Sequence, residues 1–258
     1  MDEALEGIIL AQPLETTASS QPPAKQKPYW VEPLITMVIL GVWVLYSLWE
    51  VLTHNSGTYQ NYVSPYFSPG VGDWFGWHVL DALYVAWVPL LFRFSCYYYR
   101  KEYYRGFFWD PPSCYQVDRP RPRYSGETKW PLAINNLHRY AWYLVFIVLI
   151  FLWKDAVQAF FFKNGFGVGV GSLILLVNAV FLTFYSFSCH AFRHMVGGGK
   201  DCYSCDGKPT TSYKLWHRVS RWNVFHGTWA WASLASVWAA DLYIRLLMMG
   251  VIHDVRLF

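Results

Sequence analysis

Charged residues are scarce in this chain. Only 15% of its 258 residues are Asp, Glu, Lys or Arg, whereas a soluble domain usually carries about a quarter. Hydrophobic residues make up 54% and aromatic residues 20%, with 15 Trp and 19 Tyr. Trp and Tyr favour the membrane–water interface, where an apolar ring and a polar edge are both satisfied. This composition argues against a soluble fold and favours an integral membrane protein.

Several familiar signatures are missing as well. The sequence has no phosphate-binding P-loop, no dinucleotide fingerprint and no pattern of a hydrolase triad. Its first thirty residues lack the basic start and early apolar stretch of a secretory leader. They are polar and rich in proline, so we expect residues 1–30 to form a flexible tail and residues 31–258 a single membrane domain.

Five segments are long and apolar enough to cross about 30 Å of hydrocarbon, which takes roughly 20 helical residues. They cover approximately residues 33–52, 77–97, 137–160, 168–192 and 222–249. We therefore predict an all-α, polytopic membrane protein with a bundle of five transmembrane helices.

The basic residues predict how this bundle is oriented. The connection over about 53–75 contains no Lys or Arg, while those over 93–129 and 193–221 are long and basic. If the N-terminus is cytoplasmic, only four of the 21 basic residues fall outside: Lys154, Lys163, Arg245 and Arg256. Because cytoplasmic loops carry an excess of Lys and Arg, we expect the tail in the cytoplasm, the C-terminus outside, and the chain in the cytoplasmic (inner) membrane.

On this topology the thiols and most imidazoles gather at the cytoplasmic end. The five cysteines there are Cys96, Cys114, Cys189, Cys202 and Cys205. The five histidines there are His138, His190, His194, His217 and His226. In a cytoplasm that keeps thiols reduced, such clusters indicate metal binding or redox chemistry more often than disulfides.

The densest run is SCHAFRHMVGGGKDCYSC. His190 and His194 are four residues apart at the expected end of the fourth helix and share one face. Cys202 and Cys205 follow as C-x-x-C, which can bring two thiolates to one metal ion while a His pair completes a tetrahedral site. Two Cys and two His are also the ligands of a Rieske [2Fe–2S] centre. Structural zinc, or no metal, stays open.

Two further histidines lie near the starts of predicted helices, His138 in the third and His226 in the fifth. Ionisable groups inside a membrane bundle are rare and usually functional. Both suit a heme ligand or a partner of a quinone carbonyl; the alternative is a neutral imidazole bonded to a neighbouring helix. Arg139 and Trp222 lie at the same interface, where they either line a ligand entrance or meet lipid headgroups. At the other end, we expect Asp241 and Arg245 to neutralise each other.

Five stretches together resemble the membrane-anchor subunit of succinate:quinone oxidoreductase or fumarate reductase, in its single-chain, five-helix form. They are FRFSCYYYRKEYYRGFFWDPPSCYQV, YSGETKWPLAINNLHRYAWYLVF, SCHAFRHMVGGGKDCYSC, LWHRVSRWNVFHGTWAWASL and the terminal ADLYIRLLMMGVIHDVRLF. The resemblance implies a subunit of succinate dehydrogenase, an enzyme of the tricarboxylic acid cycle and respiratory chain. It implies a flavoprotein and an iron–sulfur protein as partners, leaves room for a further small membrane subunit, and makes quinone the electron acceptor.

The resemblance is greatest to a heme-free branch of that family, which holds a membrane-embedded Rieske-type [2Fe–2S] cluster. It implies that the metal ligands come from Cys189, His190, His194, Cys202 and Cys205. Four ligands suffice, so at least one of these is surplus, and His138 or His226 can replace a member. Quinone is expected against His226, Trp222, Arg139 and His138. One alternative is b-type heme with His138, His226 and either His190 or His194 as ligands. The other is a non-redox membrane protein with a zinc-bound loop.

Overall fold

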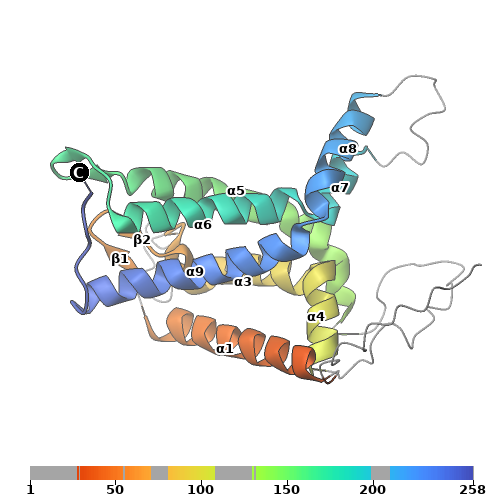
Figure 1. Cartoon of the computed structure of the whole chain (residues 1–258), viewed down its shortest axis with the longest axis horizontal. Helices are drawn as coiled ribbons and strands as arrows, with labels where there is room; N and C mark the ends of the chain where they lie inside the picture. The colour runs from red at the N-terminus through yellow and green to blue at the C-terminus, as the bar shows by residue number, and fades with distance from the viewer. Residues whose placement is uncertain are drawn as a thin grey trace, which may run out of the picture.

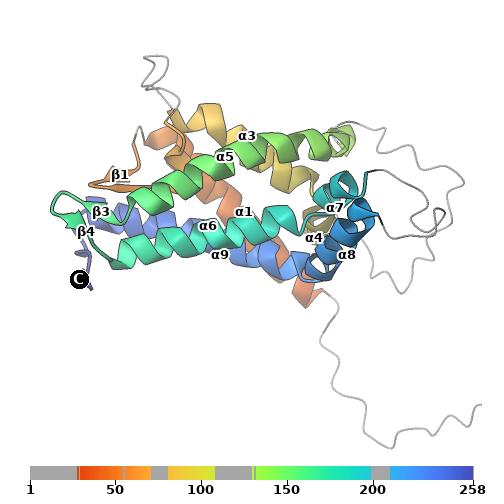
Figure 2. The same cartoon turned by 90° about the horizontal axis from the view of Figure 1, so that it is seen from above.

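The computed structural model describes residues 28, 30–54, 56–70, 81–107, 130, 132–198 and 210–257. The chain is all-α in its main architecture, as predicted, and its long helices run side by side along one axis (Figures 1 and 2). These helices are α1 (Val31–Thr53), α3 (Asp81–Ser95), α5 (His138–Gln158), α6 (Val170–Phe187) and α9 (His226–Met248). They correspond in order to the five predicted segments.

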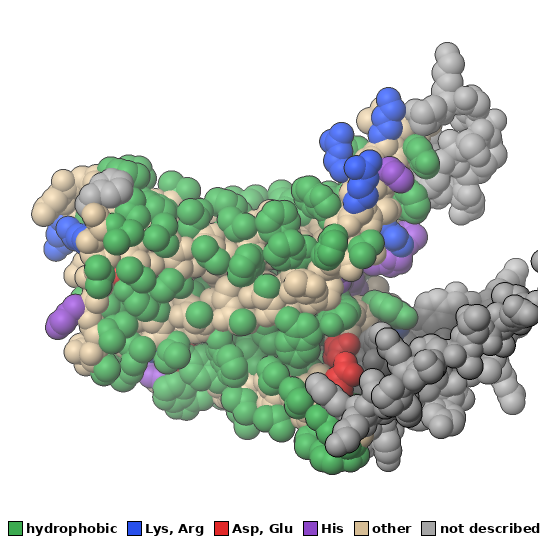
Figure 3. All heavy atoms as spheres, in the orientation of Figure 1, with side chains coloured by type: hydrophobic (Ala, Val, Ile, Leu, Met, Phe, Trp, Pro, Cys, Tyr) green, Lys and Arg blue, Asp and Glu red, His purple; other side chains and the backbone are tan. Residues whose placement is uncertain are grey.

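Within the described ranges, three helices are long and apolar enough to cross a membrane: Val31–Thr53, Ala133–Gln158 and Val170–Phe187. Helices α3 and α9 lie among them, and α9 packs along α6 while α3 packs against α5. Large apolar side chains are exposed along the flanks, such as Leu45, Ile147 and Val177, and Figure 3 shows an almost continuous apolar surface there. Such a surface suits contact with lipid chains, and the chain is a multi-pass membrane protein.

The two long basic connections contain short helices at one end of the bundle. Helices α4 (Tyr97–Phe107), α7 (His190–Val196) and α8 (Thr211–Asn223) turn away from the bundle axis there, and η2 (Leu132–Leu137) leads into α5. Helix α4 packs against α1, and α7 packs against α8. This end of the molecule is therefore built by the beginnings of α1, α5 and α9 and the ends of α3 and α6.

The predicted fourth helix, 168–192, is wrong in one respect. Helix α6 ends at Phe187, and Cys189 adopts an extended conformation (φ −62°, ψ 143°) before α7 begins. The Ser188 hydroxyl bonds back to the Tyr185 carbonyl and reaches across to His226. A tertiary contact therefore overrides helix continuation, and the His190–His194 pair lies on a separate short helix.

The opposite end is closed by short elements: β1 (Thr58–Tyr59), β2 (Tyr62–Val63), η1 (Pro65–Phe67), β3 (Phe161–Phe162) and β4 (Gly165–Phe166). Strands β1 and β2 form one antiparallel hairpin, and β3 and β4 another. Beneath them, Glu50 and Asp241 are fully buried. Arg245 pairs with Glu50 of α1, and Asp241 accepts hydrogen bonds from Tyr46 and Ser64. The guanidinium expected to neutralise Asp241 thus ties α9 to α1.

Candidate functional site

Two thiols and two imidazoles meet at the end of the bundle that carries α4, α7 and α8. Cys96 directly follows α3, and Cys189 lies between α6 and α7, two residues after Phe187. His138 is the first residue of α5, and His226 is the first residue of α9. Cys96, Cys189 and His226 are buried, and His138 is partly buried. The four side chains therefore come from four different helix ends at one level of the bundle.

The four groups form two pairs that cross between helices. The His138 Nε2 atom lies 3.0 Å from the Cys189 Sγ atom. The His226 Nε2 atom lies 3.4 Å from the Cys96 Sγ atom. Each pair therefore joins an imidazole at the start of one helix to a thiol at the end of another.

A serine holds the far nitrogen of each imidazole. The Ser95 hydroxyl lies 3.0 Å from His138 Nδ1, and the Ser188 hydroxyl lies 2.8 Å from His226 Nδ1. Each serine precedes the cysteine of the other pair. Because Nδ1 is engaged by a hydroxyl, Nε2 is the nitrogen turned toward sulfur, which is how an outer partner orients a ligating histidine.

Aromatic rings fix the two imidazoles further. Phe92 stacks on His138 with ring centroids 4.7 Å apart, and Tyr185 stacks on His226 at 5.0 Å. The Phe92 and Tyr185 rings meet edge to face at 5.4 Å. The imidazoles therefore belong to one continuous packed cluster, and neither ring is free to turn.

Both cysteines lie in turns just beyond the spanning helices, and burial raises the pKa of the Cys96 and Cys189 thiols. A bare thiolate is costly in such surroundings. A bound metal cation compensates that cost directly, because thiolate is the form that ligates metals.

A buried arginine lies one helical turn from Cys96. Arg93 donates to the Ser233 hydroxyl at 3.0 Å and to the Ala230 carbonyl at 3.3 Å. Its guanidinium also lies over the Tyr185 ring, 4.8 Å from the centroid. No Asp or Glu among the described residues pairs with it, so Arg93 places a permanent positive charge beneath the two Cys–His pairs.

A cavity of about 1090 Å³ opens beside these pairs and is lined by all four of their members. Asn135 also lines it. This side chain is only 7% exposed, and within the described part of the chain neither its amide nitrogen nor its amide oxygen has a hydrogen-bond partner. Since buried amides are almost always satisfied, Asn135 indicates that the cavity receives a polar group.

Of the five predicted metal ligands, the structure describes Cys189, His190 and His194. Cys189 lies in the cluster, but beside His138. His190 and His194 bond to each other at 3.0 Å, and both line the cavity. Cys202 and Cys205 lie outside the described residues. Among the residues that are described, no three His, Cys, Asp or Glu side chains converge closely enough to hold a single metal ion.

The predicted quinone residues are only partly brought together. His138, His226 and Arg139 line the same cavity. Trp222 packs against Phe184 of α6, with ring centroids 5.8 Å apart. The two histidines thus share a cavity with the arginine, but their Nε2 atoms face sulfur.

Cys96, Asn135 and Arg93 are functional candidates that the sequence reasoning did not single out as site residues. A repeated signal was available for the first two. The tripeptide Phe-Ser-Cys occurs twice, ending at Cys96 and at Cys189, and the pattern Asn-x-x-His occurs twice, ending at His138 and at His226. Each tripeptide ends a helix and each Asn-x-x-His begins one, which gives the site its crossed, twofold-like pattern.

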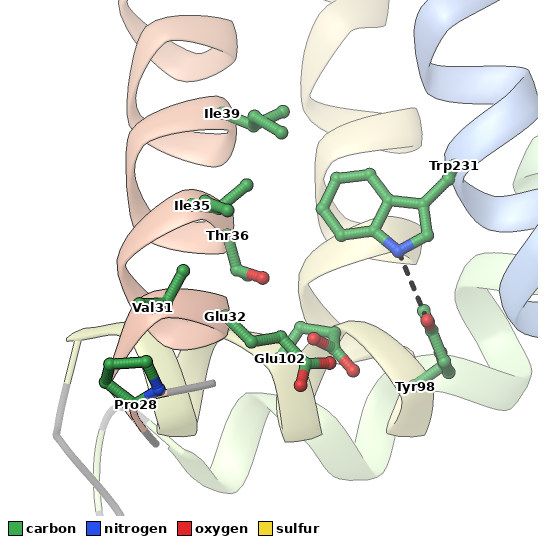
Figure 4. Close-up of a pocket in the computed structure, with 9 residues that line it drawn as sticks. All are labelled: Pro28, Val31, Glu32, Ile35, Thr36, Ile39, Tyr98, Glu102 and Trp231. Carbon is green, nitrogen blue, oxygen red and sulfur yellow. Dashed lines mark hydrogen bonds between the residues drawn. The ribbon is translucent and has the colours of Figure 1, made fainter. Parts of the chain in front are cut away.

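A second, smaller pocket of about 440 Å³ lies between α1, α4 and α9 (Figure 4). Glu32 of α1 and Glu102 of α4 point toward each other in it. Tyr98 lines both this pocket and the larger cavity, and its hydroxyl accepts a hydrogen bond from Trp231 Nε1 at 3.1 Å. Tyr98 is therefore the wall between the two.

A bundle with apolar flanks and a buried thiol–imidazole cluster at one end defines the class: a polytopic membrane protein with a cluster of reactive side chains. Residues 31–250 match the family model of the actinobacterial succinate dehydrogenase subunit SdhC. The chain belongs to this family and is a membrane-anchor subunit of succinate dehydrogenase, which confirms the resemblance at that level.

A solved structure agrees with this assignment. The chain is similar to one chain of the Mycobacterium smegmatis Sdh1 complex in the apo form, with a TM-score of 0.75 and 32% sequence identity. The match covers 93% of this chain and 96% of that one. No curated protein matches the chain. Membership in a multi-subunit complex and in the membrane follows from these matches.

Proposed function

We propose that this subunit passes electrons from a peripheral iron–sulfur protein to membrane quinone, and that Cys96, Cys189, His138 and His226 hold a Rieske-type [2Fe–2S] cluster for that purpose. The observation that carries the proposal is the crossed pairing of two buried thiols with two imidazoles. The ligand set differs from the sequence-based expectation: Cys189 stays, and residues from the other helix ends replace the loop cysteines and the α7 histidines.

The donor set suits such a cluster. A Rieske centre takes two cysteines on one iron and two histidines on the other, and the site offers two of each. A single zinc ion needs three or four ligands at one point, an arrangement that the described residues do not provide. Heme between two histidines requires both ligating nitrogens to be open to the iron, whereas here both Nε2 atoms face thiols. The unpartnered Asn135 amide supports a further polar group beside them.

When bound, the cluster supplies reversible one-electron transfer between the iron–sulfur partner and quinone. The residues of this chain perform the rest. Ser95 and Ser188 orient the imidazoles, and Arg93 provides a positive charge that favours an added electron. A quinone headgroup fits the same cavity beside Arg139, since about 1090 Å³ suffices for a small-molecule site. Reducing quinone consumes protons, and the mutually bonded His190 and His194 stand at the cavity to pass them.

The partner surface follows from this placement. The flavoprotein and iron–sulfur subunits would cover the end that carries α4 and α7, because electrons must arrive where the thiols lie. This end would face the cytoplasm, as the distribution of Lys and Arg predicts. The N-terminus would then be inside and the C-terminus outside.

Metal analysis of the purified complex tests the proposal. We expect the complex to hold two iron atoms and two acid-labile sulfides more than the iron–sulfur partner accounts for, and to lose this excess while staying assembled in Cys96→Ser and Cys189→Ser. The matched control is Cys202→Ser with Cys205→Ser, which should keep both. Loss of iron and sulfide in the control variant alone would show that the loop cysteines, Cys202 and Cys205, are the ligands. Porphyrin in place of the excess sulfide would establish heme, and zinc in place of the excess iron would remove the redox role.

A further inference from the structure

Helix α8 (Thr211–Asn223) carries a one-sided set of basic residues. Lys214, Arg218 and Arg221 are spaced four and three residues apart, which places them on one face of the helix. All three are exposed. The helix contains no Asp or Glu, so nothing on α8 itself neutralises this face.

Exposed apolar side chains lie directly beside the basic ones. Leu215 is 41% exposed and Trp222 is 46% exposed, and the seven-residue spacing puts them on one side of the helix. The two residues that join α8 to α9, Val224 and Phe225, are 78% and 59% exposed. Exposed apolar side chains thus border the basic face of α8 and are also present in the two residues that lead into α9.

The rest of α8 is held against the protein. Val219 is buried, and the Arg193 guanidinium of α7 lies over the Trp216 ring, 5.6 Å from its centroid. This packing decides which side of α8 is left outward. The basic and apolar strips are therefore fixed in orientation.

The position of α8 places these strips at one end of the bundle. The helix crosses the end of the bundle and projects past α5 and α6 (Figure 1). Lys and Arg side chains gather on it beside the apolar flank (Figure 3). Because only two residues separate its last turn from α9, α8 lies at the level where the bundle ends.

We propose that α8 is an interfacial helix that binds anionic phospholipid headgroups. Lys214, Arg218 and Arg221 contact the phosphates, while Leu215 and Trp222 enter the boundary with the acyl chains. Basic residues combined with Trp and Leu on one helix are what such a surface requires. A water-soluble protein partner would contact only the basic side chains of α8. It would leave the exposed apolar residues at the start of α9 in contact with lipid. The proposal does not depend on the identity of the redox centre.

The test uses the assembled complex reconstituted in phosphatidylcholine bilayers that contain spin-labelled phosphatidylglycerol or spin-labelled phosphatidylcholine. Electron paramagnetic resonance measures the fraction of each label immobilised by the protein. We expect a preference for phosphatidylglycerol that weakens with each neutralisation in Lys214→Gln, Arg218→Gln and Arg221→Gln. At these sites each charge should account for about a fivefold change in association, from about 1 kcal/mol per basic residue.

Lys163→Gln is the matched control, because it removes one exposed lysine at the other end of the bundle. It should not weaken the preference for phosphatidylglycerol as Arg218→Gln does. An unchanged lipid preference in the triple variant would overturn the proposal. So would loss of the soluble subunits from the triple variant with the lipid preference intact, because α8 would then serve a protein interface.

Discussion

At the scale of single residues, the site depends on the two serines as much as on the thiols. Each serine hydroxyl holds an imidazole Nδ1 and so directs Nε2 toward sulfur. The serine also precedes the cysteine of the other pair, so one Ser-Cys dipeptide serves both pairs. Because each Ser-Cys dipeptide takes part in both pairs, the repeated patterns Phe-Ser-Cys and Asn-x-x-His are enough to form the site.

Replacing Ser188 by Ala should therefore weaken metal retention without removing a ligand. Loss of an outer partner of a ligating histidine typically costs about 10–100-fold in metal affinity. Ser220→Ala is the control, because that hydroxyl bonds only to the Trp216 carbonyl within α8. Iron retained after a chelator challenge measures the difference. Equal retention in the two variants would show that the Ser188 hydroxyl does not position His226.

Arg93 should tune the redox centre. A positive charge favours the reduced, more negative state, so Arg93→Gln should lower the midpoint potential. Screened Coulomb interaction at this range amounts to about 1–2 kcal/mol, or tens of millivolts. Arg93→Lys keeps the charge and serves as the control for packing. A redox titration followed by electron paramagnetic resonance reads the potential, and an unchanged value in Arg93→Gln would contradict this role.

At the scale of elements, the site depends on how closely α4 approaches α9. A methyl group on Gly227 would lie 2.6 Å from the Tyr98 ring, so only glycine permits this contact. Since Gly227 directly follows His226, the packing of α4 also sets the position of one imidazole. Tyr98 at the same time separates the two pockets.

Gly227→Ala should consequently destabilise the subunit by about 1–3 kcal/mol, the usual cost of overpacking. Gly41→Ala is the matched control, because nothing lies within 4 Å of a methyl group there and alanine favours a helix. Thermal unfolding of the purified complex compares the two. A Gly227→Ala protein as stable as Gly41→Ala would mean that α4 adapts freely.

Sequence patterns predict the helices of the bundle well and their ends poorly. Apolar length alone places α1, α5 and α6. Apolar length does not predict the end of α6. The break at Cys189 comes from the Ser188 hydroxyl, which bonds to His226, 38 positions away in the sequence. Long-range contacts also build the thiol–imidazole cluster. His226 lies beside Cys96 although 130 positions separate them in the sequence, and a local run such as His190 to Cys205 does not reveal that contact.

At the scale of the whole molecule, the two ends have different chemistry. One end gathers the two described thiols, Cys96 and Cys189, most of the described imidazoles and the basic helices. The other end buries Glu50 and Asp241 beneath two hairpins. The sorting of Lys and Arg along the sequence is enough to predict that the reactive groups share one end. It does not predict the crossed pairing, which depends on the order of helices around the bundle.

The sidedness itself can be measured. A cysteine replacing Lys163, in the turn between β3 and β4, should react with an impermeant maleimide from the outer side of sealed spheroplasts. A cysteine replacing Arg218 should react only after the membrane is opened. The positive-inside distribution is the physical reason for this expectation. The opposite labelling pattern would show that the orientation is reversed. The thiols and imidazoles would then lie on the side away from the cytoplasmic partners.

The central claim is that imidazoles from two helix starts ligate iron beside two cysteines from two helix ends. Pulsed electron paramagnetic resonance of the reduced complex, from cells grown with ¹⁵N-histidine, tests it most directly. The account predicts couplings to two histidine nitrogens, both retained in His190→Ala and His194→Ala and one lost in His138→Ala or His226→Ala. Couplings that vanish with His190 or His194 and survive without His138 and His226 would contradict it.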